Sequence, residues 1–255
     1  MCLINFHFQD HDNYQLVVAA NRDESYTRPT AGAHFWEDDP FILAGRDLLQ
    51  GGTWLGIAKN GRFAALTNFR DPKLPVKGRY SRGEIVRQFL TGKMEPSDYI
   101  NQLAMNREMY DGFNVLVGNG SQLYHYNNIL NEKNIISPGT HSLSNHTLNT
   151  PWPKVVKGKQ MLKEHMNANK GVMELKPLFE IVADEAIASD NDLPDTGVGL
   201  QTERALSPLF IKMPGYGTRS STVLLIDKEN NITFAERVFI DGQYHEEKRF
   251  VFKIE

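Results

Sequence analysis

Residues 2–8 read CLINFHF and residues 15–20 read QLVVAA, with the polar stretch DHDNY between them. Apolar runs on either side of a polar turn are typical of a β-hairpin. The second run continues directly into Asn21-Arg22-Asp23-Glu24. A hairpin brings this tetrapeptide back beside the N-terminal end of the first strand, where Cys2, the single cysteine of the chain, stands.

Further strands and helices follow from the spacing of apolar residues. Residues 53–58 and 62–68 form a second predicted hairpin around the turn KNG, and more strands are expected at residues 113–117, 122–126, 220–226, 232–240 and 244–254. Helices are expected after the capping-box pair Ser81 and Glu84, and at residues 96–106, 151–167 and 174–188. Residues 71–78 and 189–199 are expected to be loops. Because strands cluster at both ends of the chain, the sequence predicts an α+β fold of antiparallel sheets with outer helices, in a single domain over residues 1–255.

Composition excludes several classes of protein. The chain has 255 residues and a net charge of −3, so no basic field favours a nucleic-acid partner. A single cysteine cannot form an internal disulfide. The first apolar run follows no basic residues and is too short for a signal sequence or a membrane span. These features favour a cytoplasmic protein without an integral membrane segment.

The remaining motifs favour structural roles. Eight histidines show no H-E-x-x-H or C-x-x-C spacing, so neither a metal nor a cofactor is expected. The glycines of residues 45–56, GRDLLQGGTWLG, fit no nucleotide-binding motif and are expected to permit close backbone approach. A solvated helix face is expected to carry the lysines at positions 154, 157, 159 and 163.

Cys2 is the first candidate for chemistry. Removal of Met1 would leave a nucleophilic thiol and a free α-amine on one residue. The amine titrates near pH ~8 and the thiol near ~8.5, so the neutral amine can accept the thiol proton. With Met1 retained, the nitrogen is an amide and this chemistry is lost. The alternative for Cys2 is a small buried hydrophobic residue at the start of a strand.

Other polar residues that end or begin apolar runs could complete such a site. Arg22 can lower the pKa of the thiol and Asp23 can hold the amine, or both can belong to a solvated turn. Asn68 can donate to an oxyanion, or simply end its strand. Asn145 can position a substrate carbonyl, or stabilise a turn. Arg219 can bind a carboxylate or phosphate, or can be an exposed charge at a sheet edge.

Taken in order along the chain, these motifs closely resemble the NRDE family, also called the transport and Golgi organisation protein 2 family. The matching segments are MCL at residues 1–3, ANRDE at 20–24, RPT at 28–30, GGTWLG at 51–56, LTN at 66–68, SNHTLNTPWPK at 144–154 and TRSST at 218–222. The resemblance implies a connection to Golgi organisation, lipid and acyl-CoA homeostasis, and haem trafficking.

The layout is also similar, more distantly, to the cysteine N-terminal nucleophile hydrolases, such as penicillin V acylase, bile salt hydrolase and acid ceramidase. This similarity implies a four-layer αββα sandwich of two antiparallel sheets flanked by helices. The site it implies has Cys2 as nucleophile, Arg22 as the charge near the thiol, Asp23 holding the amine, Asn68 as oxyanion donor, and Asn145 and Arg219 completing the site. Asp23 follows Arg22 directly here, closer than in those hydrolases.

Two functions are compatible with these residues. The first is an amidohydrolase that attacks a linear, non-peptide C–N bond of an N-acyl small molecule through Cys2. The second is a binder or chaperone of haem, acyl-CoA or another amphipathic ligand on the same scaffold. The expected partner is therefore a small-molecule substrate or an amphipathic ligand, and a homo-oligomer is left open.

Overall fold

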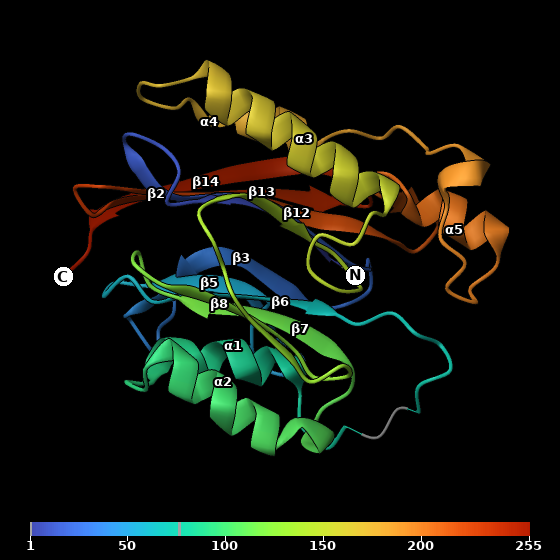
Figure 1. The fold of residues 1–255 in the computed structure, drawn as a ribbon, viewed down its shortest axis with the longest axis horizontal. Helices are drawn as coiled ribbons and strands as arrows, with labels where there is room; N and C mark the ends of the chain where they lie inside the picture. The colour runs from blue at the N-terminus through green and yellow to red at the C-terminus, as the bar shows by residue number, and fades with distance from the viewer. Residues whose placement is uncertain (1, 76–77) are drawn as a thin grey trace.

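The computed structural model describes residues 2–75 and 78–255, so part of the predicted loop at residues 71–78 lies outside the described residues. Two seven-stranded sheets, in which every pairing is antiparallel, lie face to face (Figure 1). Helices cover the outer face of each sheet, which gives four layers. The α+β fold class and the αββα arrangement expected from the sequence are confirmed.

The first sheet has the strand order β10-β1-β2-β12-β13-β14, with β11 paired to β12. Its strands are β1 (Cys2–Phe8), β2 (Tyr14–Ser25), β10 (Gly139–Leu143), β11 (Lys212–Met213), β12 (Tyr216–Asp227), β13 (Asn231–Ile240) and β14 (Gln243–Lys253). The second sheet runs in chain order from β3 to β9. Its strands are β3 (Thr30–Phe35), β4 (Ile42–Asp47), β5 (Leu55–Ala58), β6 (Phe63–Asn68), β7 (Phe113–Gly118), β8 (Leu123–Asn127) and β9 (Glu132–Ile135).

The helices divide between the two outer faces. α1 (Arg82–Thr91) and α2 (Pro96–Met105) pack on the second sheet, and α3 (Pro153–Ala168) and α4 (Leu175–Val182) pack on the first. The short α5 (Leu200–Leu206) lies at the end of the sandwich near the start of α3 (Figure 1). Single 3₁₀ turns occur at Arg107–Met109 and Asp190–Asp192, the latter inside the predicted loop at residues 189–199.

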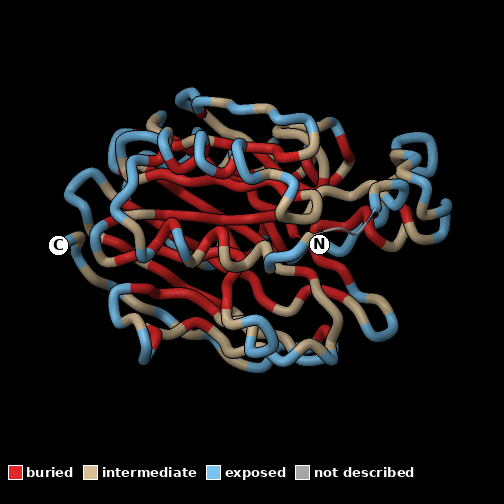
Figure 2. The backbone as a smooth tube through the Cα atoms, turned by 90° about the horizontal axis from the view of Figure 1, so that it is seen from below, coloured by how far each residue is buried: buried red, intermediate tan, exposed pale blue. Residues whose placement is uncertain are grey.

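β1 is buried along its whole length because it lies between β10 and β2 and is covered on both faces. Side chains alternate along a strand, and Ile4 and Phe6 pack in the core between the two sheets while Leu3 packs in the core beneath α3. Burial on both faces explains why CLINFHF lacks a regular alternation of apolar and polar residues. Figure 2 shows this buried centre, with exposure confined mainly to the outer helix faces and loops.

The second predicted strand is longer than the sequence indicates. β2 continues to Ser25, so the NRDE tetrapeptide lies within the strand and not in a solvated turn. The extra length follows from pairing on both edges, since β1 pairs with β2 as far as Arg22 and β12 pairs with it as far as Ser25. Asn21 and Asp23 are consequently buried.

Two helix predictions need correction. The predicted helix at residues 174–188 ends at Val182, whose carbonyl oxygen accepts a hydrogen bond of 2.7 Å from Asn21 Nδ2. A buried amide from β2 therefore replaces the next helical turn as the partner of that carbonyl. Ser81 does precede α1, but its side chain makes no capping hydrogen bond, and the Glu84 N–H donates to the Ser81 carbonyl oxygen instead.

Apolar periodicity does not predict β3, β4, β9, β10 or α5. β9 reads EKNI and lies at a sheet edge with alternate residues exposed, so its sequence carries little apolar signal. α5 has seven residues, too few to show an amphipathic repeat. The predicted strand at residues 53–58 is shorter in the structure, because pairing begins at Leu55.

A polar network is buried between the sheets around His125, on β8. Asn114 Oδ1 accepts from His125 Nε2 at 3.0 Å and from Asn127 Nδ2 at 2.8 Å. Asn134 Nδ2 donates to His125 Nδ1 at 3.1 Å. One N–H donor and one ring acceptor satisfy the neutral imidazole. Burial lowers the pKa of His125 to about 4, so the histidine is neutral at physiological pH.

We expect His125 to make the protein sensitive to mild acid. Its pKa is near 6.5 in the unfolded chain and about 4 in the folded protein, so between these values only the unfolded chain takes up the proton. The free energy of unfolding should therefore fall as the pH drops from about 6.5 to about 4, by on the order of 3 kcal/mol from this residue. Urea denaturation across this range should show a smaller fall for H125Q than for the wild type. H245Q, at an exposed histidine, should behave as wild type, and equal acid sensitivity in H125Q would contradict the prediction.

Candidate active site

Cys2 lies at the start of β1 in the wall of a cleft of about 670 Å³. Strand pairing places it directly opposite Arg22 on β2, and Arg22 lies opposite Ser220 on β12. The cleft is also lined by Asp23, Asn68 and Arg219. Of the six residues that the sequence singles out, five therefore meet in one cleft, and Asn145 alone lies outside its lining.

The Cys2 thiol is a weak acid in this setting. Cys2 is only 8% exposed, and burial raises the pKa of its thiol. The negative charge of Asp23 raises this pKa further, while Arg22 and a hydrogen bond from the Asp23 backbone N–H oppose the rise. The resting thiol is therefore protonated at neutral pH, and a base must remove its proton before the sulfur can attack a carbonyl.

Asp23 is held by an irregularity in the neighbouring strand. The register of β12 against β2 shifts between Thr218 and Ser220, as in a β-bulge, with Thr218 opposite Asp23. Thr218 Oγ1 donates a hydrogen bond of 2.7 Å to Asp23 Oδ1, and Tyr216 Oη donates to the Asp23 carbonyl oxygen at 3.0 Å. Burial raises the pKa of Asp23, which is 1% exposed, while the positive charge of Lys154 and the bond from Thr218 lower it.

The two asparagines occupy different depths. Asn68 ends β6 at the cleft wall, where its side chain is partly exposed. Asn145 is fully buried, and its Nδ2 donates to the Asn68 carbonyl oxygen at 3.0 Å. Ser144 Oγ lies 3.1 Å from both Asn145 Oδ1 and the Cys2 carbonyl oxygen, which share its single hydroxyl proton. Asn145 thus connects the strand of Asn68 to the strand of Cys2 from behind the cleft wall.

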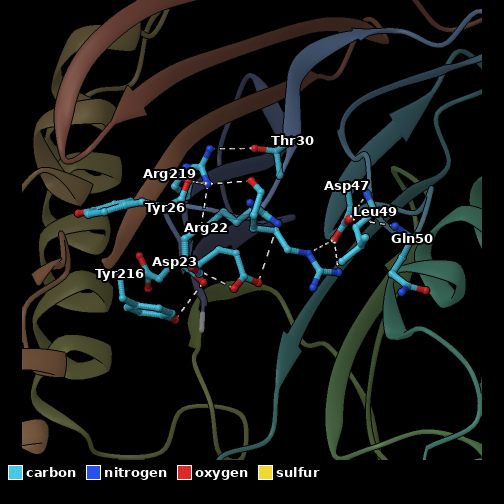
Figure 3. A network of polar contacts seen from close by, with 12 residues as sticks. Arg22, Asp23, Tyr26, Thr30, Asp47, Leu49, Gln50, Tyr216 and Arg219 are labelled. Atoms are coloured by element: carbon cyan, nitrogen blue, oxygen red, sulfur yellow. Dashed lines mark hydrogen bonds and ion pairs between the residues drawn. The ribbon is translucent and has the colours of Figure 1, made fainter. Parts of the chain in front are cut away.

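Arg219 holds the segment that follows β2 (Figure 3). Its Nη1 donates to the carbonyl oxygens of Ser25, Tyr26 and Arg28 at 2.8, 3.1 and 3.0 Å, and its Nη2 donates to Thr30 Oγ1 at 3.2 Å. These bonds tie the connection between β2 and β3 to β12, so Arg219 shapes one side of the cleft. The expectation of an exposed charge at a sheet edge is wrong, because Arg219 is half-buried and its strand, β12, lies between β2 and β13.

The GGTWLG segment closes another side of the cleft by packing backbone against backbone. Gly51 has a φ of +73°, a region that favours glycine. A Cβ on Gly52 would lie 2.5 Å from the carbonyl carbon of Gly83 in the first turn of α1. Thr53, Trp54 and the start of α1 all line the cleft. The expected role in close backbone approach is confirmed for Gly52, whereas Gly51 has no atom within 4 Å of its Cβ position and is favoured by its positive φ alone.

Several charged residues near the site were not anticipated as part of it. Lys154 is 3% exposed, so the prediction of a solvated position is wrong for this lysine. Glu236 on β13 is also buried beside the cleft, and Arg82 Nη1 donates to the Gly112 carbonyl oxygen at its edge. The burial of Lys154 could have been predicted from its spacing. It precedes Gly158 by four residues and Leu162 by eight, and all three lie on the buried face of α3.

The family model for Transport and Golgi organisation 2 matches residues 1–241 of the chain. The chain belongs to the Transport and Golgi organisation 2 family. The family's homolog from Bos taurus is 36% identical over 260 residues, which cover 93% of this chain and 92% of the relative. The Homo sapiens homolog is 35% identical over 264 residues, which cover 94% of each chain. The family resemblance of the sequence motifs is thereby confirmed.

Solved structures of other proteins resemble this family member in fold. Two crystal structures of mutants of conjugated bile acid hydrolase from Clostridium perfringens match it with TM-scores of 0.52 and 0.51, at 9% and 8% identity. Each match covers 98% of this chain and 97% of the other. At such low identity the likeness shows a shared fold.

Within residues 2–75 and 78–255, no helix is long and apolar enough to span a membrane. Nor does the described part of the chain bring together three or more His, Cys, Asp or Glu side chains that could hold a metal ion.

We expect Arg219 to stabilise the fold as well as to shape the cleft. In R219K a single ammonium cannot reach all the carbonyl oxygens that the guanidinium binds, so the unfolding free energy should fall by about 1–3 kcal/mol. Differential scanning calorimetry should show a Tm lower by roughly 3–10 °C. R249K, at an exposed arginine of β14, is the matched control and should leave the Tm unchanged. An unaltered Tm in R219K would contradict the structural role.

Proposed function

We propose that this protein is a hydrolase of linear, non-peptide C–N bonds in N-acyl small molecules, with Cys2 as its nucleophile. The observation that carries the proposal is the position of Cys2, which begins β1 in the wall of the cleft, opposite Arg22 and on the same cleft as Asn68. The scaffold shared with a conjugated bile acid hydrolase supports the same class of reaction. A cleft of about 670 Å³ is of the size that accommodates small molecules.

Because the resting thiol of Cys2 is protonated, the reaction needs a base that removes this proton. In the proposed mechanism Met1 is removed, and the free α-amine of Cys2 accepts the thiol proton as the sulfur attacks the acyl carbon. A C–S bond forms, the C–N bond breaks, and the ammonium returns the proton to the departing amine. Water then attacks the thioester, the α-amine takes its proton, and the C–S bond breaks to release a carboxylic acid and restore the thiol.

The other residues have distinct proposed roles. The Asn68 amide donates to the oxyanion that develops on the carbonyl oxygen. Arg22 favours the thiolate, and the Asp23 carboxylate orients the amine. Asn145 and Arg219 act through their bonds to the backbone, Asn145 by holding the Asn68 carbonyl and Arg219 by holding the segment after β2.

The first test of this function is the state of the N-terminus and the formation of an acyl-enzyme. Intact-mass measurement of the purified protein should show loss of Met1, and brief incubation with N-acyl 4-nitroanilides of increasing chain length should add one acyl mass to the wild type. C2A should acquire no acyl mass and release no 4-nitroaniline. Turnover by protein that retains Met1 would contradict the mechanism. Reversible binding without turnover would favour the alternative, a binder of haem, acyl-CoA or another amphipathic ligand.

The second test concerns the oxyanion. N68A should lower kcat for the 4-nitroanilide by about 10²–10³-fold, because one oxyanion donor is lost. Alkylation of Cys2 by iodoacetamide should proceed at the wild-type rate, since that reaction develops no oxyanion. N101A, on the exposed face of α2, is the control and should retain activity. A fall in kcat below tenfold would remove Asn68 from the proposed site.

A further inference from the structure

Lys154 is placed behind Cys2 by the way α3 lies on β1. At the C-terminal end of the helix, the Asn169 carbonyl oxygen and His11 Nε2 are 2.7 Å apart, and His11 follows the end of β1. Further along, Gly158 sits so close to β1 that a Cβ there would lie 2.5 Å from Asn5 Oδ1. The helix therefore runs from the Phe8 end toward the Cys2 end as its residue numbers fall. Lys154, one turn before Gly158 on the same buried face, lies beyond Asn5 on the side of Cys2.

Asp23 faces the same side of the sheet. Side chains alternate along β2, so Arg22 points with Cys2 toward the cleft while Asp23 shares the face of Asn21. Asn21 bonds to the end of α4, which fixes this face as the one beneath α3 and α4. Among the charges that act on the buried Asp23 carboxyl, the ammonium of Lys154 is the strongest and has the opposite sign.

Burial of the Lys154 ammonium costs free energy unless a nearby negative charge compensates for the lost hydration. Its Nζ makes no hydrogen bond with any residue in the described part of the chain. Its place in the first turn of α3 is also unfavourable, because the helix dipole favours negative charge there. Burial lowers the pKa of Lys154 to about 8, against the opposing effects of Asp23, Cys2 and Glu203. The Lys154 side chain is therefore largely cationic at neutral pH, although its burial disfavours the charged form.

A buried ion pair lies beside Lys154. Arg70 Nη2 and Glu203 Oε2 are 3.0 Å apart and both side chains are almost completely buried, with the Arg70 guanidinium 4.4 Å from the Trp152 ring centre. A crevice of about 10 Å³ is lined by these residues and by Lys154. Arg70 has Glu203 as its counter-ion, and of the negative charges that act on Lys154 that of Asp23 has the largest effect.

We propose that Lys154 is a positioning residue of the Cys2 site, whose ammonium favours the ionised form of Asp23 behind the nucleophile. The inference rests on the proposed function, in which the Asp23 carboxylate orients the α-amine of Cys2. A neutral Asp23 in this buried position would lose the charge that attracts the ammonium formed during the reaction. Lys154 therefore acts on the chemistry through Asp23 and contacts neither substrate nor the reacting atoms.

The test measures the ionisation of Asp23 directly. The carboxyl ¹³C resonance of Asp23, assigned by its absence in D23N, is titrated by NMR in the wild type, K154M and K154R. The titration midpoint should rise by about one unit or more in K154M and by less in K154R, because an opposite charge nearby shifts a carboxyl by this amount. K157M is the matched control on the same helix, since Lys157 is 42% exposed and pairs with Asp184. Its Asp23 midpoint should equal that of the wild type.

Turnover gives the second readout. Hydrolysis of the 4-nitroanilide probe by K154M should fall about tenfold at pH values below both Asp23 midpoints, because a one-unit rise lowers the ionised fraction tenfold there. It should recover as the pH rises through the new Asp23 midpoint. A purely structural role for Lys154 would lower Tm without moving either titration. If the wild type shows no turnover, the proposed hydrolase fails while the NMR comparison still decides the role of Lys154.

A reciprocal measurement tests the same interaction if K154M does not fold. Because the interaction is mutual, removing the Asp23 charge in D23N should lower the titration midpoint of the Lys154 Cε resonance by about one unit. An Asp23 midpoint unchanged in K154M, or a Lys154 midpoint unchanged in D23N, would overturn the proposal.

Discussion

The pairing of β1 with β2 is the constraint on which the rest of the structure depends. β1 is hydrogen-bonded along both edges and covered on both faces, so a slip of one residue would turn Ile4 and Phe6 toward α3 and Leu3 toward the second sheet. The register that buries these side chains correctly also places Cys2 opposite Arg22. Core packing and the position of the candidate nucleophile are therefore determined by the same contacts.

The alternation of side chains along β2 explains why the adjacent charges of Arg22 and Asp23 lie in different surroundings. Arg22 lies with Cys2 on the face toward the second sheet. Asp23 also lines the cleft, but its side chain lies on the face beneath the helices, where it bonds to Thr218 and the positive charge of Lys154 acts on it. Charges buried in this way are unfavourable for stability unless each has a counter-ion. In the region around Asp23, Arg70 is paired with Glu203, and the positive charge of Lys154 acts on the Asp23 carboxyl. Through Asp23, the proposed site at Cys2 extends across the sheet to α3 and α5.

Much of the fold and of the site could be predicted because the relevant signals are local. Turn residues between apolar runs reveal the hairpin of β1 and β2, and the order of polar motifs along the chain indicates the cleft residues from Cys2 to Arg219. Elements without such signals were missed. β9 is a polar edge strand and α5 is too short for a periodic pattern, and both form because neighbouring elements supply their partners.

The sequence by itself determined the family and the antiparallel sheets with outer helices, because hairpin spacing and motif order can be read without long-range contacts. The resemblance to the N-terminal nucleophile hydrolases implied the αββα arrangement and the site residues, of which all but Asn145 line the cleft. Only the tertiary structure decided which polar side chains are buried and what they bind. Arg219 binds backbone carbonyls, Asn145 lies behind the cleft wall, and Lys154 is enclosed beneath its helix. The physical reason is that the environment of a charge depends on what packs against it, and those partners come from strands and helices far away in the chain.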